Sequence, residues 1–260
     1  MKTESLLKPM SGYAAALVML VCLVAFAFFI NRENEAPAAI SLLVFFILAK
    51  GLVVVPPNSS KVLLLFGAYK GSLNSTGLFW INPLFFRSSV SLRARNLESE
   101  KIKVNDKMGN PILISVILVW KVRDTYKASF EVDNYESFVK IQTDSAVRKL
   151  AGSFPYDHFE DERASITLST NFEDVNKALE REISERLDMA GIEVIEARIG
   201  YLAYAPEIAQ AMLRRQQASA VVAARHKIVE GAVGMVENAL MLLSQKQIIE
   251  LDEEKKAAMV

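Results

Sequence analysis

Residues 111–122 read PILISVILVWKV, a stretch in which apolar side chains occupy every second position. One face carries only apolar side chains, at Ile112, Ile114, Val116, Leu118, Trp120 and Val122. The other face is mixed, with Ser115, Ile117, Val119, Lys121 and Arg123. A two-residue period over this length is strand geometry. The wholly apolar face predicts that helices cover one side of the strand.

The residues just before this strand predict its hairpin partner. Residues 105–110 (NDKMGN) are a turn sequence, because Asn, Asp and Gly tolerate tight backbone conformations. Ile102 and Val104 alternate immediately before that turn. We therefore expect two antiparallel strands joined at residues 105–110.

Two more strands are expected upstream. Residues 61–66 (KVLLLF) form a short apolar run that ends at Gly67. Residues 88–97 alternate, with Val90 and Leu92 facing one way. The stretch between the two runs is predicted to be rich in loops, because it is punctuated by Gly71, Gly77 and Pro83.

Helical spacing appears after the long strand. A helix is predicted from Asn134, a suitable N-cap, to Gly152. A second is predicted over residues 171–190, before a cap at Gly191, with an apolar stripe at Phe172, Val175, Leu179, Ile183 and Leu187. A strand over 192–201 follows, and Pro206 is suited to open a last helix.

The last helix carries a repeat that predicts self-association. The helix is predicted from Pro206 to beyond Ile249. Positions 208 to 243 recur in it at alternating steps of four and three and are mostly apolar, which is the spacing of a coiled-coil seam. The proposed oligomer seam is Val222, His226, Val229, Val233, Val236, Leu240 and Leu243. The alternative is a long helix packed on its own domain. His226 is either a pH-sensitive seam residue or an ordinary packed histidine.

The amino terminus is apolar enough to enter a bilayer. Residues 12–30 form an uncharged run, and a second apolar segment covers residues 36–55. The short polar break between them favours a transmembrane hairpin. A single span followed by a buried strand is the alternative, and a cleaved signal peptide is disfavoured because Phe28-Phe29-Ile30 follows the Ala-x-Ala site at residues 25–27. The distribution of lysine and arginine predicts that the residues before the first apolar segment and those after the second both lie in the cytoplasm.

Composition argues against several classes of protein. Thirty basic and thirty acidic residues give no net charge, which disfavours a nucleic-acid binder. The single cysteine, Cys22, cannot form an internal disulfide. With only His158 and His226, no cofactor or metal site is expected. The acidic clusters at 160–162 and 252–254 are interpreted as solvated surface, so we expect no enzyme.

The order of the quoted pieces resembles the SPFH superfamily, the stomatin, prohibitin and flotillin group also called band 7. The similar residues run from about Gly51 to Leu243. They include KVLLLFGAYKGSL (61–73), GLFWINPLF (77–85), the strand pair at 93–124, FEVDNYESFVKIQTDSAVRKLAGSFPYD (130–157) and the helical residues 201–233. The tail after Leu243 is short, whereas flotillins carry a very long coiled coil.

The resemblance implies an α+β domain, a twisted and mostly antiparallel sheet with helices packed on it. We divide the chain into a membrane anchor (1–55), an SPFH domain (56–203) and a long C-terminal helix with a charged tail (204–260). The implied function is a non-enzymatic scaffold, anchored in the cell membrane, that organises membrane microdomains or encloses membrane proteins. Its implied partners are other copies of the chain, in high-order homo-oligomers, and membrane lipids. The alternative is a regulatory partner that restrains a membrane protease or transporter. An enzyme using His158 is a third reading.

Overall fold

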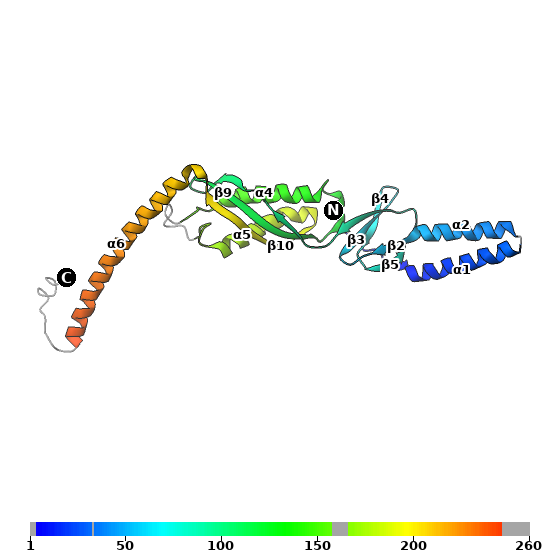
Figure 1. Cartoon of the computed structure of the whole chain (residues 1–260), viewed down its shortest axis with the longest axis horizontal. Coiled ribbons are helices and arrows are strands. Elements are labelled where there is room, and N and C mark those ends of the chain that lie inside the picture. The colour runs from blue at the N-terminus through cyan, green and yellow to red at the C-terminus, as the bar shows by residue number, and fades with distance from the viewer. Residues whose placement is uncertain (1–3, 33, 158–165, 246–260) are drawn as a thin grey trace.

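The computed structural model describes residues 4–32, 34–157 and 166–245 of the chain. A pair of helices stands at one end, a mixed α+β body lies in the middle, and a long helix leaves the other end (Figure 1). The chain is therefore elongated, with the two apolar helices and the long helix far apart.

Helices α1 (Gly12–Asn31) and α2 (Glu35–Gly51) lie side by side and antiparallel (Figure 1). The small residues Ala15 and Ala38 are buried, which lets the two backbones approach closely. Most of the remaining side chains face outward, although they are apolar. Among the described helices, α1 has the length and composition to cross a membrane, over Gly12–Ile30.

A small antiparallel sheet, in the order β1-β5-β2, holds the base of the helix pair. Its strands are β1 (Met10–Ser11), β2 (Leu52–Val55) and β5 (Gly77–Trp80). The second apolar segment, expected as one unit over residues 36–55, therefore contains two elements. Its helix ends at Gly51, and its last four residues extend to pair with β5.

A second antiparallel sheet has the order β4-β3-β6. It consists of β3 (Ser59–Leu65), β4 (Ala68–Leu73) and β6 (Phe86–Ser91). The prediction of a loop-rich stretch between residues 67 and 83 was wrong, because β4 and β5 occupy much of it. Gly71 in β4 and Gly77 in β5 adopt φ values of 147° and 136°, which favour glycine over residues with a side chain.

The largest sheet is antiparallel and centres on the long strand predicted from the sequence. Strand β9 (Pro111–Val122) pairs with β10 (Ile192–Tyr204) on one side, and with β7 (Arg95–Glu98) and β8 (Ile102–Asn105) on the other. The β8–β9 hairpin is confirmed. The alternation over residues 88–97 does not form one strand, because it divides between β6 and β7 in different sheets.

Helices cover this sheet, as the apolar face of β9 predicts. That face is buried throughout, at Ile112, Ile114, Val116, Leu118, Trp120 and Val122. Helix α4 (Tyr135–Ser153) and helix α5 (Phe172–Leu187) pack against it, and α3 (Thr125–Phe130) and the short helix η1 (Asp188–Ala190) complete the body (Figure 1). Asn134 caps α4 as predicted, accepting hydrogen bonds from two backbone N–H groups. Gly191 has φ +66° and ends η1.

Helix α6 (Pro206–Gln245) is forty residues long and points away from the body (Figure 1). At 1.5 Å per residue it extends about 60 Å. Pro206 occupies its first turn as predicted. The expected continuation beyond Ile249 lies outside the described residues.

Candidate functional site: the base of the helix pair and the exposed long helix

Two glycines seat the helix pair directly on strand β5. A Cβ atom at Gly51 would lie 2.3 Å from Trp80 Nε1, and one at Gly12 would lie 2.5 Å from Leu78 Cγ. Trp80 Nε1 also donates a hydrogen bond to the carbonyl oxygen of Leu48, 3.0 Å away, near the end of α2. The start of α1 and the end of α2 are thus both fixed to the folded domain.

Arg87 caps the end of α2. Its Nη2 donates to the carbonyl oxygen of Lys50 across 2.7 Å, and its Nη1 donates to that of Leu52 across 3.3 Å. Burial lowers the pKa of Arg87 from its ordinary value. A cation at the carboxyl end of a helix is favourable, because the last carbonyl groups are unpaired and carry partial negative charge. Sequence reasoning did not single out this residue.

The residues before α1 return along the domain and are bonded to it. Thr125 Oγ1 donates to Glu4 Oε1 across 2.6 Å, and Asn74 Nδ2 donates to the same carboxylate across 3.3 Å. Backbone hydrogen bonds join Ser5 and Leu7 to Ser72. The chain therefore enters the helix pair from the domain and returns to the domain.

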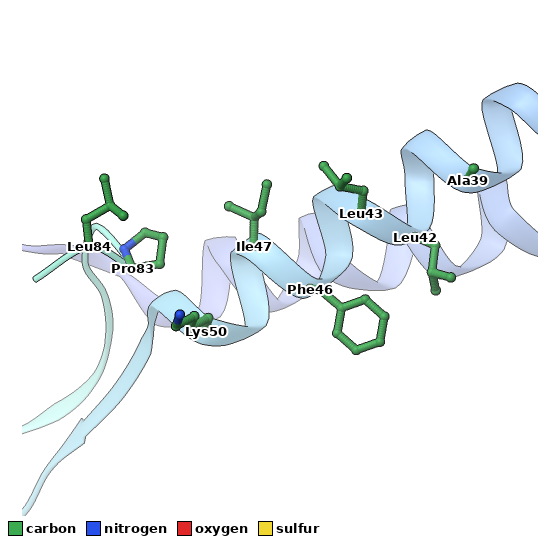
Figure 2. A pocket seen from close by; sticks show the side chains of 8 residues that line it. All are labelled: Ala39, Leu42, Leu43, Phe46, Ile47, Lys50, Pro83 and Leu84. Carbon is green, nitrogen blue, oxygen red and sulfur yellow. The ribbon is translucent and has the colours of Figure 1, made fainter.

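Large apolar side chains are exposed close to the base of the helix pair. Phe66 is 89% exposed at the β3–β4 turn, Leu84 is exposed between β5 and β6, and Phe86 is exposed at the start of β6. An apolar groove of about 620 Å³ runs along the outer face of α2 to this loop. Figure 2 shows its lining, which is Ala39, Leu42, Leu43, Phe46, Ile47, Lys50, Pro83 and Leu84.

The predicted seam residues lie on the unburied helix α6. From Pro206 to Leu243 every described α6 side chain is exposed or half-buried. Val222, Val229 and Val233 are exposed, as is His226, whereas Val236, Leu240 and Leu243 are half-buried. The structure of one chain brings none of them to the body, so their contact with another chain stays a prediction.

A second apolar stripe on α6 was missed from the sequence. Val221, Ile228, Met235 and Leu242 are exposed and recur every seven residues. Each precedes a seam residue by one position, and so lies about 100° around the helix from it. The signal was present in the sequence as a second heptad-spaced series, one residue out of phase with the first.

Polar contacts set the direction in which α6 leaves the body. Asp157 Oδ2 accepts hydrogen bonds from Tyr204 Oη at 2.9 Å and from Gln216 Nε2 at 3.3 Å. The Tyr204 ring also packs on that of Tyr156, with centroids 4.0 Å apart. Lys103 forms an ion pair with Glu207, and its hydrogen bond lowers the pKa of that carboxyl. Sequence reasoning identified none of these contacts.

The remaining candidates for chemistry stay apart or fall outside the described residues. His158 and the acidic clusters at 160–162 and 252–254 belong to the undescribed segments. Within the described part of the chain, no three His, Cys, Asp or Glu residues gather as a metal site would require. Cys22 lies partly buried on α1, so the thiol stands in the apolar helix pair.

Comparison with known proteins identifies the class to which this fold belongs. The SPFH domain / Band 7 family matches residues 53–232, and the chain belongs to that family. Two stomatin homologs are among its relatives. The one from Pyrococcus horikoshii is 26% identical over 192 residues, which is 74% of this chain and 68% of that protein. The one from Pyrococcus abyssi is 25% identical over the same shares. The resemblance stated from the sequence is confirmed.

Proposed function

We propose that this protein is a non-enzymatic scaffold that is anchored in a membrane by α1 and α2 and assembles laterally through α6. One observation carries the proposal. The same chain holds an apolar helix pair that is hydrogen-bonded to a folded domain at one end, and a long helix with exposed apolar stripes at the other. The first feature supplies an anchor, and the second supplies surface for other copies of the chain.

The contacts of the first residues support two membrane crossings. Glu4 and Leu7 are bonded to the same domain that follows α2. An α1 that crosses a bilayer must therefore be followed by an α2 that returns. The two helices, of 20 and 17 residues, extend about 30 and 26 Å, which is close to the thickness of the hydrocarbon core.

Charge at the two ends of the helix pair supports a cytoplasmic domain. Lys50, Lys61 and Arg87 lie at or near the domain end. At the tip, Arg32 stacks its guanidinium over the Phe28 ring, 4.8 Å from the centroid, and Glu35 stands close in sequence. Lysine and arginine favour the cytoplasmic side. The domain, with the start of α1 and the end of α2, then faces the cytoplasm, and the tip of the helix pair lies on the other side of the membrane.

Anchoring makes weak lateral contacts sufficient for assembly. Copies confined to one plane meet at a high effective concentration, so each helix–helix contact contributes to a larger avidity. The two α6 stripes face different directions, so one helix offers surface to a neighbour on each side. Head-to-tail contacts of this kind generate rings when the rotation closes.

The test is to introduce charge into the seam. In Val229→Glu/Val233→Glu/Val236→Glu, three carboxylates replace apolar side chains on the predicted contact. We expect native electrophoresis in mild detergent to show loss of the high-mass species, while the domain stays folded. The matched control Ala220→Glu/Gly234→Glu/Met241→Glu adds the same charge on a face of α6 away from both apolar stripes and should keep that species. An unchanged high mass in the seam variant would refute assembly through α6.

A further inference from the structure

The groove on α2 has a shape that suits one extended hydrocarbon chain. Two rows of side chains form its walls, Ala39, Leu43 and Ile47 on one side and Leu42, Phe46 and Lys50 on the other (Figure 2). Each row repeats every four residues, so the rows run along the helix. Pro83 and Leu84 close the groove at the Lys50 end.

The length of the groove matches one leaflet of a bilayer. From Ala39 to Lys50 the helix rises about 16 Å, whereas half of the hydrocarbon core is about 15 Å thick. The polar end of the groove, at Lys50, lies beside the domain. A hydrocarbon chain that fills the groove from the bilayer centre would therefore place its headgroup at Lys50.

The charges at that end are positive. Lys50 is exposed and lines the groove, and Arg87 lies against its backbone carbonyl group. None of the residues that line the groove is acidic. In the described ranges, Lys50 has no carboxylate partner. Its amine can reach toward the headgroup level while its stem covers apolar surface.

We infer that this groove binds one anionic glycerophospholipid, with an acyl chain between the two α2 rows and the phosphate at Lys50. This inference rests on the proposed membrane anchoring of the helix pair. The volume of about 620 Å³ lies in the range of pockets that hold single small ligands. A lipid supplies both the apolar chain and the anion that the lining requires.

The experiment is native mass spectrometry of the full chain, extracted from membranes in mild detergent and titrated with phosphatidylglycerol or phosphatidylcholine. We expect the wild type to bind one phosphatidylglycerol per chain in preference to phosphatidylcholine. Removing one lysine charge at the headgroup, in Lys50→Gln, should weaken phosphatidylglycerol binding about fivefold and leave phosphatidylcholine unchanged. The control Lys70→Gln removes an equal charge from exposed β4, outside the groove, and should bind as the wild type does.

A second variant tests the acyl half of the site. Ala39→Phe fills the far end of the groove and should reduce the uptake of both lipids. Equal losses in the Lys50 and Lys70 variants would overturn the inference, because they would indicate general attraction to charge. The inference would also be overturned if the wild type bound neither lipid and Ala39→Phe lowered the mass of the complex. That result would assign the groove to contact with a second copy of the chain.

Carbonate extraction separates this inference from the proposed function. Protein that carbonate releases from membranes would refute the anchor itself. Protein that stays in the membrane, yet shows no preference for phosphatidylglycerol, would refute the lipid site and leave the anchor in place.

Discussion

Thr125 Oγ1 donates a hydrogen bond to Glu4 Oε1 across 2.6 Å, joining residues that are 121 positions apart. Thr125 is fully buried at the start of α3, and its hydroxyl also lies 2.7 Å from the buried Ser72 Oγ. This contact holds the residues that precede α1 on the domain. It therefore places the residues before α1 at the domain end of the helix pair.

Replacing this hydroxyl should loosen the amino terminus. In Thr125→Val the side chain keeps its shape but loses its buried hydrogen bonds to the Glu4 carboxylate and the Ser72 hydroxyl, which then keep only those with Asn74 and Tyr69; this costs about 1–3 kcal/mol. We expect faster hydrogen exchange over residues 4–11 and a lower denaturation midpoint. Thr125→Ser keeps the donor and should behave nearly as the wild type. Equal exchange in all three proteins would show that the contact does not hold this segment.

The topology can be tested by labelling single cysteines in a Cys22→Ser background. Asn31→Cys lies at the end of α1 near the tip of the helix pair, whereas Ser75→Cys is exposed on the domain. We expect a membrane-impermeant maleimide to label Asn31→Cys in intact cells, and Ser75→Cys only after permeabilisation. Labelling of both positions from the same side would contradict a helix pair that crosses the bilayer.

Acid should weaken the contact between α4 and α5. Glu182 on α5 accepts hydrogen bonds from Lys149 at 2.6 Å and from Arg186 at 2.8 Å. The hydrogen bond from Lys149, aided by that from Arg186, holds the pKa of Glu182 below its ordinary value. Because the native pKa is the lower one, the stabilisation is present above the unfolded pKa of about 4.3 and is lost as the pH falls through the native pKa.

The matching measurement compares the unfolding free energy of wild type and Glu182→Gln across pH. We expect a difference of about 1 kcal/mol at pH 7 that shrinks on acidification below about pH 4. Glu185→Gln is the control, because its pair with Arg181 is long, at 4.0 Å, and highly exposed. A Glu182→Gln difference that stayed constant down to pH 3 would rule out the carboxylate as its source.

Local periodicity explains what could be predicted from the sequence. The apolar face of β9 is set by alternation within twelve residues, and the cap at Asn134 is set by the residues beside it. Such signals need no knowledge of distant contacts. The same holds for the spacing of the valines on α6, which predicts a seam but does not identify its partner.

Long-range pairing explains what could not be predicted. Gly77 reads as a loop residue, yet it belongs to β5 and pairs with Val55 of β2. Gly71 also reads as a loop residue, although it lies in the local β3–β4 hairpin. Leu52–Val55 continues an apolar run, and only its pairing with β5 distinguishes it from the helix before it. Glu4 stands in a short polar stretch with no pattern, so its bond to Thr125 required the folded structure.

The most direct test of the scaffold is the native mass of the wild-type complex, extracted from membranes in mild detergent, with every co-purifying protein identified. We predict a discrete species of many copies, a multiple of 28.9 kDa, that contains this chain and lipid. A single copy, or one copy bound to a different membrane protein in fixed stoichiometry, would contradict the account and favour a regulatory partner instead.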